Sequence, residues 1–207
     1  GHWRPFAAAL QDAGIEIVSG MIGTKGEDYS TPESIHRTGG VVPDETWEEN
    51  LERVEASVKG ANDLGFSYIS THAGFLPESD QDPTFEKLLS RIETIANIYG
   101  EHGLSLLFET GQETAATLNM FLDALADRGA TNVGVNFDPA NMFLYDMGDP
   151  IPALRDLAPR LLQVHIKDGL PPEKPGEWGT EVPVNSGRVD WTAFFDVLND
   201  AGYMGDL

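Results

Sequence analysis

The sequence predicts an α/β fold in which parallel strands alternate with helices and curve into a barrel. Segments with a strand's period of two alternate along the chain with segments whose apolar residues follow helical spacing. Every connection between successive strands is long enough for a right-handed parallel crossover. Three consecutive strands end on Glu109, Asp138 and His165, and the curvature of a barrel aims neighbouring strand ends at one point. A doubly wound sheet is the alternative, but its usual glycine-rich phosphate turn is absent from the sequence.

Five strands and the beginning of a sixth are expected. In chain order they cover residues 15–21, 66–71, 104–109, 133–138, 161–169 and 203–207. In the segment 161–169, Leu162 and Val164 share an apolar face, whereas His165 and Lys167 share the opposite face. Helices packed outside the sheet would cover the apolar face, so the polar face is expected to point into the barrel.

Helices are expected between these strands, because each intervening segment has apolar residues at helical spacing. They cover residues 6–13, 46–65, 82–99, 114–128, 149–160 and 190–198. Thr46 begins a capping box, Asp82 precedes a proline at the first helical position, and Asp190 is placed to cap the last helix. The segments 20–42 and 169–189 are rich in glycine and proline, which predicts long loops where α/β folds place their sites.

The composition indicates one acidic domain over residues 1–207, with 41% hydrophobic residues and a net charge of −21. Such a surface repels phosphate backbones, so no nucleic-acid partner is expected. The acidity fits either simple solubility or adaptation to high salt. With no cysteine, the strong metal ligands left are histidine and carboxylate. No apolar run approaches the roughly 20 residues of a membrane helix, so no membrane partner is expected.

Glu109, Asp138 and His165 are the candidate site residues, because each is a metal-ligand type at an inward-facing strand end. Taken singly, such an Asp would cap the next helix and such a His would satisfy a local hydrogen bond. Taken together, they indicate a shared site. His72, which follows the strand 66–71, is a second candidate histidine, and a structural role for it is equally well supported.

Four motifs resemble the xylose isomerase-like TIM-barrel superfamily of sugar isomerases and epimerases. They are FET at 108–110, NFDPANM at 136–142, VHIKDG at 164–169, and G-x-VDW followed by GYxG at 187–205. Relatives of this superfamily include ketose 3-epimerases, hydroxypyruvate isomerase, inosose dehydratase and the endonuclease IV type of repair enzyme. The resemblance implies a (β/α)8 barrel that is incomplete in this chain, without its first two strands and most of its last.

The resemblance also implies a divalent metal held by Glu109, Asp138 and His165, with a fourth ligand, a glutamate, expected beyond Leu207. We expect Mn²⁺, with Mg²⁺, Co²⁺ and Zn²⁺ as alternatives. In the family, the two glutamates act as acid and base. Glu109 is therefore expected to be catalytic as well as metal-binding.

The activity implied is that of an isomerase or epimerase that moves a proton beside the carbonyl of a ketose or polyol-derived substrate, through an enediolate. Lys167 and His72 are expected to stabilise the enediolate oxygen or to orient hydroxyls, although a rim salt bridge to Asp168 is an equal alternative for Lys167. Asn141 stands where ketose 3-epimerases commonly have a histidine, so isomerase and inosose dehydratase-like lyase chemistry both stay open. Trp178 and Arg188 are expected to contact substrate or a neighbouring subunit, or else to be ordinary loop residues.

Two other classes were weighed against this enzyme. A non-catalytic sugar-binding relative would keep the barrel without the acid and base pair. An endonuclease is disfavoured, because the chain has five histidines in total and a charge of −21. The expected partner is a small sugar, association with further copies of the chain is left open, and the expected location is the cytoplasm.

Overall fold

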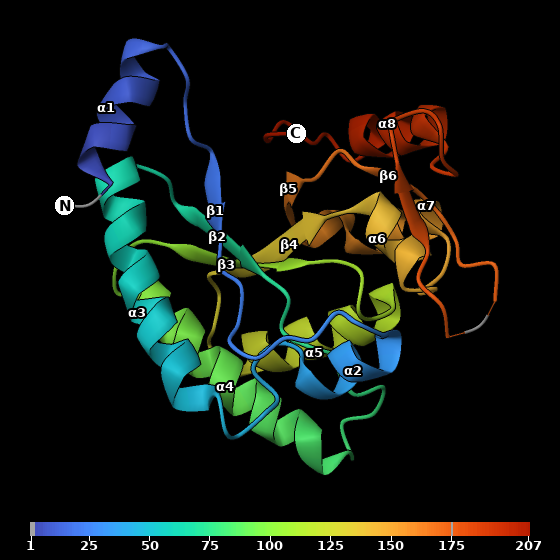
Figure 1. The fold of residues 1–207 in the computed structure, drawn as a ribbon, viewed down its shortest axis with the longest axis horizontal. Coiled ribbons are helices and arrows are strands. Elements are labelled where there is room, and N and C mark those ends of the chain that lie inside the picture. Colours follow the sequence, from blue (N-terminus) through green and yellow to red (C-terminus); the bar gives the residue numbers. More distant parts are fainter. Residues whose placement is uncertain (1–2, 175) are drawn as a thin grey trace.

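The computed structural model describes residues 3–174 and 176–207, and a five-stranded parallel sheet forms its centre. The strands follow chain order across the sheet: β1 (Ser19–Met21), β2 (Tyr68–Thr71), β3 (Ser105–Glu109), β4 (Val133–Phe137) and β5 (Leu161–Val164). Figure 1 shows the sheet curling from β1 to β5, with helices against its outer face. The curled wall of parallel strands confirms the predicted fold class.

Helices connect and cover these strands. In the described part of the chain they are α1 (Arg4–Asp12), α2 (Pro32–Thr38), α3 (Trp47–Leu64), α4 (Pro83–Gly100), α5 (Ala115–Asp127), α6 (Pro139–Leu144), α7 (Pro150–Leu157), the 3-10 turn η1 (Ala158–Arg160) and α8 (Trp191–Asp200). Two predicted caps are confirmed, since the Asp82 carboxylate accepts the N–H of Thr84 at 2.7 Å and the Asp190 carboxylate accepts that of Ala193 at 3.0 Å. Among the described residues, no helix has both the length and the apolar character to cross a membrane.

The core lies between the outer face of the sheet and the helices α4 and α5. Leu106 and Phe108 of β3 are buried, and Phe108 packs edge-on against Phe121 of α5 with ring centroids 6.0 Å apart. The strand's period of two puts these side chains on one face and Glu109 on the other. Burying each large apolar side chain stabilises the fold by about 1.5–3 kcal/mol. The apolar face of β3 therefore fixes the direction in which Glu109 points.

The segment 20–42 was predicted to be a loop throughout, but it contains the short helix α2. The Thr31 hydroxyl accepts the N–H of Ser34 at 3.0 Å, and Pro32 occupies the first helical position. A helix of 7 residues spans about two turns. That is too short for a helical period to stand out in a glycine-rich sequence.

The predicted loop 169–189 also contains regular structure. Residues on either side of the glycine- and proline-rich tip pair as an antiparallel hairpin, β6 (Asp168–Leu170) with β7 (Thr180–Val182). Strands of 3 residues carry too little alternation to be recognised from sequence. The hairpin lies beside α6 on the right of Figure 1.

A buried carboxylate, Asp168, organises the return from this hairpin to α8. It accepts backbone N–H groups from Asn185 at 2.9 Å, Gly187 at 3.0 Å and Val189 at 3.2 Å, and the indole N–H of Trp191 at 3.2 Å. Burial alone would raise the pKa of Asp168, but these donors outweigh it and lower the pKa. Asp168 is thus committed to the loop, and it forms no salt bridge with Lys167.

Several elements differ from prediction. The strand predicted over 161–169 ends at Val164, so His165 and Lys167 lie beyond its end rather than on its inner face. Residues 203–207 do not form a sixth strand, since the Tyr203 hydroxyl donates to the Asp206 carbonyl at 2.7 Å and the chain turns. The first strand is only Ser19–Met21 rather than 15–21. Thr46 precedes α3 as expected, but its side chain makes no cap and instead accepts from the Asn50 amide at 3.3 Å.

Candidate metal centre

Three side chains converge at the carboxyl edge of the sheet. Glu109 is the last residue of β3, Asp138 follows β4, and His165 follows β5. Nδ1 of His165 lies 3.2 Å from Oδ2 of Asp138 and 3.4 Å from Oε1 of Glu109. One ligand atom from each residue can be chosen so that all lie within 4.8 Å of one another. The carboxyl ends of parallel strands share one edge, which is why residues far apart in sequence meet here.

Asp138 is fully buried, and its two carboxylate oxygens have different surroundings. Oδ1 accepts the N–H of Asn141 at 3.0 Å and caps α6. Oδ2 accepts no directed hydrogen bond, although it lies 3.0 Å from Nζ of Lys167 as well as beside His165. Burial opposes ionisation of Asp138, but His165 and Lys167 outweigh it and lower the pKa. A charged oxygen with a free lone pair therefore faces the centre of the site.

The imidazole of His165 lies beside both carboxylates. Its contacts with Asp138 and then Glu109 raise the pKa of His165 to about 10, against the opposing effect of burial. The side chain is 48% exposed, so it borders solvent while its ring faces the carboxylates. A metal ion bound by all three residues would take the place of the imidazole proton between this nitrogen and the carboxylate oxygens.

Two amides hold the Glu109 carboxylate. Asn136, its partner in register across β3 and β4, donates to Oε2 at 3.2 Å. Asn141, from the first turn of α6, donates to Oε1 at 3.3 Å. Asn141 also accepts from Nζ of Lys167 at 2.7 Å, so it links the lysine to the glutamate. Asn136 opens the motif NFDPANM, but the sequence gives it no role, because its contact with Glu109 arises from the register between β3 and β4.

The donor set fits a divalent metal. It offers two carboxylates and one imidazole, which suits Mn²⁺, Mg²⁺, Co²⁺ or Zn²⁺. Oδ2 of Asp138 is buried, and its close neighbours are the basic nitrogens of Lys167 and His165, so it is the kind of carboxylate oxygen that a metal ion would bind. Within the described residues, no other group of three histidine or carboxylate ligands is so close together.

The sequence profile of the xylose isomerase-like TIM barrel family matches residues 2–206. The chain belongs to this family. Its structure matches 84 chains of solved structures. No curated protein sequence matches it.

Three solved structures illustrate the likeness of this xylose isomerase-like chain. A xylose isomerase domain protein from Planctomyces limnophilus is 35% identical with a TM-score of 0.92, and the match covers 100% of this chain and 74% of that one. An L-ribulose 3-epimerase is 20% identical with a TM-score of 0.71, covering 98% and 64%. A xylose isomerase-like TIM barrel protein from Mycobacterium smegmatis, in complex with magnesium, is 19% identical with a TM-score of 0.69, covering 97% and 68%.

Other matches, all below 25% identity, include further sugar epimerases, a probable dehydratase and a protein with a bound zinc atom. The distant matches show the fold alone. Together they place epimerase and dehydratase activities on the barrel that this xylose isomerase-like chain shares.

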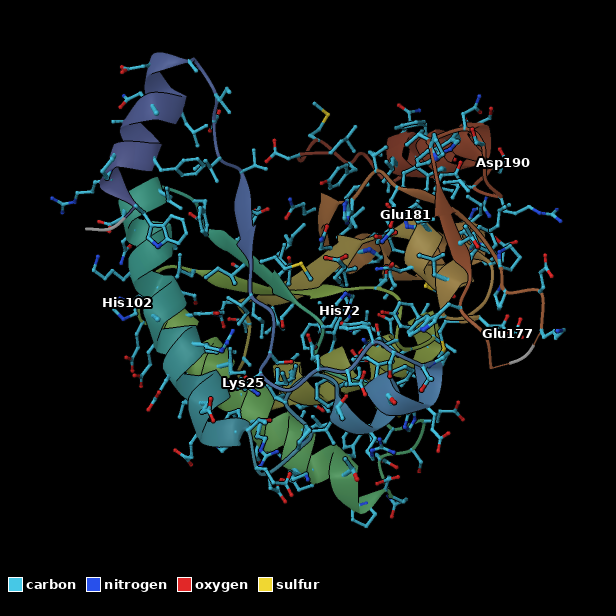
Figure 2. All side chains as sticks on the ribbon, viewed as in Figure 1. Lys25, His72, His102, Glu177, Glu181 and Asp190 are labelled. Carbon is cyan, nitrogen blue, oxygen red and sulfur yellow. The ribbon has the colours of Figure 1, made fainter. Side chains whose placement is uncertain are left out.

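A cavity of about 400 Å³ opens beside the metal centre of this xylose isomerase-like barrel. It is lined in part by His72, Glu109, Asn141, Lys167 and Trp178. Nε2 of His72 lies 3.9 Å from Oε1 of Glu109, while its Nδ1 is buried without a hydrogen-bond partner. Figure 2 shows His72 in the interior, and Glu181 on the hairpin that borders the cavity. The structure thus brings these sequence-predicted residues together.

Trp178 forms an aromatic wall of this cavity with two tyrosines. Its ring lies 5.2 Å from that of Tyr145, edge-on, and 6.3 Å from that of Tyr29. Neither tyrosine was indicated by the sequence, because both lie in irregular segments with no period. Arg188 is different: it is exposed, it does not line the cavity, and its backbone N–H donates to the Gly169 carbonyl at 2.9 Å.

Proposed function

We propose that this chain carries the metal-binding part of a sugar isomerase or epimerase, which moves a proton beside the carbonyl of a ketose or polyol-derived substrate. The observation that carries the proposal is the convergence of Glu109, Asp138 and His165, with the buried Oδ2 of Asp138 beside the imidazole nitrogen of His165. Because the chain spans 74% and 64% of the first two matching structures, the proposal concerns the site rather than a complete reaction cycle.

Glu109, Asp138 and His165 would hold the metal, and Mn²⁺ is the ion we expect. When bound, a divalent ion supplies Lewis acidity that makes a C–H beside a coordinated carbonyl easier to ionise. Asp138 is suited to ligation because burial keeps water away from Oδ2 while Lys167 keeps the carboxylate ionised.

Glu109 is the group proposed to move the proton. Its carboxylate is oriented by two amides, since Asn136 donates to Oε2 and Asn141, which lines the cavity, donates to Oε1. Glu109 borders the cavity with His72 and Lys167, and a substrate there would lie within reach of its carboxylate. The Lys167 ammonium is placed to stabilise negative charge on a substrate oxygen, and His72 to orient a hydroxyl.

Trp178 supplies the apolar wall against which a sugar ring would pack. Together with Tyr29 and Tyr145 it closes one side of the cavity and excludes water from the reacting carbon. Asn141 cannot titrate, and both ends of its amide are engaged by Glu109 and Lys167. We therefore assign it to positioning these two residues rather than to proton transfer.

A dehydratase of the inosose type is the second candidate. It is favoured by the non-titrating Asn141 at the position where ketose 3-epimerases commonly carry a histidine. A dehydratase would remove a hydroxyl as water, so product analysis separates the two: epimerisation conserves mass, whereas dehydration lowers it by one water.

The test is calorimetric titration of Mn²⁺ into the protein and into Asp138→Ala and His165→Ala variants, with activity assayed on ketoses and inosose. Glu55→Ala, which removes an exposed carboxylate from α3, is the matched control. We expect binding in the wild type and the control, and a loss of about 100-fold or more in the other two, because changing only the residues that orient a ligand already costs about 10–100-fold. No binding by the wild type would overturn the proposal, as would binding that both variants retain.

A further inference from the structure

A buried carboxyl group lies outside the metal centre. Glu113, between β3 and α5, is 7% exposed, and its Oε1 is sealed from solvent without a hydrogen-bond partner. No ion pair reaches it from the residues that the structure describes. Burial alone raises the pKa of Glu113 to about 8, from an ordinary 4.5. Such uncompensated burial is costly, which suggests a purpose other than stability.

Glu113 lines a separate cavity of about 420 Å³, and none of Glu109, Asp138 and His165 contributes to it. The cavity lies between α2, the loop after β2, the start of α4 and the start of α5.

The lining of this cavity is acidic. Glu78 from the loop after β2 and Asp82 at the start of α4 add two carboxylates to that of Glu113. The one basic side chain in the lining is His36 of α2, which is exposed, and no lysine or arginine lines the cavity. The charged side chains of the lining at pH 7 are thus the carboxylates of Glu78 and Asp82, and the protein as a whole carries a charge of −21, which favours a cationic ligand.

The other lining residues indicate that the ligand is not a bare metal ion. Phe75, Pro77 and Met147 give the cavity an apolar side, and the Phe75 ring stacks on His36 with centroids 4.5 Å apart. A metal ion needs several oxygen ligands at once. The carboxylates here do not converge, since in the described chain only the metal centre has three such ligand atoms within 4.8 Å.

We propose that this cavity binds a small primary amine, whose ammonium group pairs with Glu113 and whose alkyl part packs against Phe75. An ammonium group has three N–H donors, and a carboxylate accepts them strongly in a site removed from water. The aromatic ring adds apolar contact and attraction for the cation. On pairing, the carboxylic acid of Glu113 loses its proton to the buffer and the amine stays protonated.

The probe is n-butylamine, titrated at pH 7 into metal-free protein, with 1-butanol as the uncharged molecule of equal length. The ceiling of about 1.5 kcal/mol per heavy atom limits this five-heavy-atom amine to a micromolar dissociation constant at best, and because deprotonating Glu113 takes part of that binding energy we expect roughly the millimolar range. The alcohol should bind at least about tenfold more weakly, since it forms no charge-assisted pair. Calorimetry in two buffers of different ionisation enthalpy should show close to one proton released per amine, because Glu113 is mostly protonated at pH 7.

Three variants separate this site from the metal centre. Glu113→Gln should weaken amine binding about tenfold or more and abolish proton release. Glu101→Gln removes an exposed charge at the end of α4, and Asp138→Ala removes the proposed metal site, so both should bind the amine as the wild type does.

Equal affinity of the wild type for amine and alcohol would overturn the proposal, as would unchanged amine binding by Glu113→Gln. Absence of binding at about 50 mM amine would do the same. If Glu113→Gln does not fold, the proposal is still tested by two measurements on the wild type: the affinity for amine compared with alcohol, and the proton release on amine binding. Because the proposed function depends on Asp138 and this cavity does not, each can fail without the other.

Discussion

At the scale of single residues, Asp138 serves the fold with one oxygen and the candidate chemistry with the other. Oδ1 caps α6 through the Asn141 N–H, while Oδ2 faces Lys167 and His165. An asparagine could keep the cap with its carbonyl oxygen, but it would present an NH₂ group, which cannot ligate a metal, where Oδ2 now lies.

Asp138→Asn is therefore expected to lose Mn²⁺ binding while its urea-unfolding free energy stays within about 2 kcal/mol of the wild type. Asp190→Asn is the matched control, since Asp190 caps α8 through the same contact and lies outside the site. Calorimetry and urea titration measure the two quantities. Equal Mn²⁺ affinity in Asp138→Asn and the wild type would show that Oδ2 is not a ligand.

Glu113 predicts an unusual dependence of stability on pH. Its pKa in the folded state, about 8, lies above the ordinary value of 4.5. Below pH 4.5 Glu113 is therefore protonated in both the folded and the unfolded state, and its ionisation does not change the free energy of unfolding. Between these values the unfolded state loses the proton and the folded state keeps it, so stability falls as pH rises. The full cost, on the order of 3–5 kcal/mol, is reached above pH 8.

Glu113→Gln should accordingly match the wild type near pH 4 and be more stable by a few kcal/mol near pH 8. Urea unfolding at a series of pH values from about 4 to 9 measures this difference. Glu101→Gln, which removes an exposed carboxylate, should follow the wild type throughout. A difference between Glu113→Gln and the wild type that is independent of pH would contradict the raised pKa.

At the scale of elements, the hairpin β6 to β7 and the loop behind it depend on Asp168 and on one glycine. A Cβ atom at Gly187 would lie 2.1 Å from Oδ1 of Asp168, which is too close for any side chain. The backbone must therefore move away from the carboxylate if Gly187 is replaced, and the hydrogen bond from its N–H is lost with it.

Gly187→Ala is expected to lower the free energy of unfolding by about 2–4 kcal/mol, from the lost bonds to a buried charge and from local strain. Gly23→Ala is the control, because no atom lies within 4 Å of a Cβ there. Urea unfolding compares them, and near-ultraviolet circular dichroism reports on Trp178 and Trp191. A Gly187→Ala variant as stable as Gly23→Ala would show that the loop does not need this close approach.

The sequence could predict the elements that are long enough to show a clear hydrophobic period, and the site residues at the ends of those elements. The apolar face of β3 identified Glu109, and the motif after β4 identified Asp138. It could not predict α2, β6 or β7, since 7 and 3 residues are too few to establish a period. Nor could it predict Asn136 or Tyr145, because their contacts with Glu109 and Trp178 arise from packing between segments distant in sequence.

At the scale of the whole molecule, acidic residues outnumber basic ones, with 34 Asp and Glu against 13 Lys and Arg. Arg128 forms salt bridges with Glu86 and Glu93, and Arg91 forms one with Asp44. Most carboxylates in the described part of the chain form no salt bridge. Their mutual repulsion destabilises the compact state when screening is weak. The screening length falls from about 10 Å at 0.1 M salt to about 3 Å at 1 M.

The melting temperature is therefore expected to rise as KCl increases from about 0.05 M to 2 M, with most of the gain below 1 M. A double variant, Glu55→Lys with Glu101→Lys, reverses two exposed charges and should give a shallower rise. Differential scanning calorimetry measures both slopes. A melting temperature that falls with KCl would contradict the electrostatic origin and leave the acidic surface as an aid to solubility.

The Gln163 amide donates to the Ser19 hydroxyl at 2.8 Å, across 144 residues of chain, and so joins β5 to β1 beneath the metal centre. Closing a loop of that length costs about 1 kcal/mol more than closing the roughly 40-residue loops between neighbouring strands. Contacts between adjacent strands should consequently form earlier, and this one last. His165 does not wait for this contact, because its backbone N–H donates to the Phe137 carbonyl at 2.9 Å and so it is placed beside Asp138 by the pairing of β4 with β5. The three candidate ligands would therefore come together before β1 joins β5, and a captured metal ion could stabilise that intermediate stage of folding.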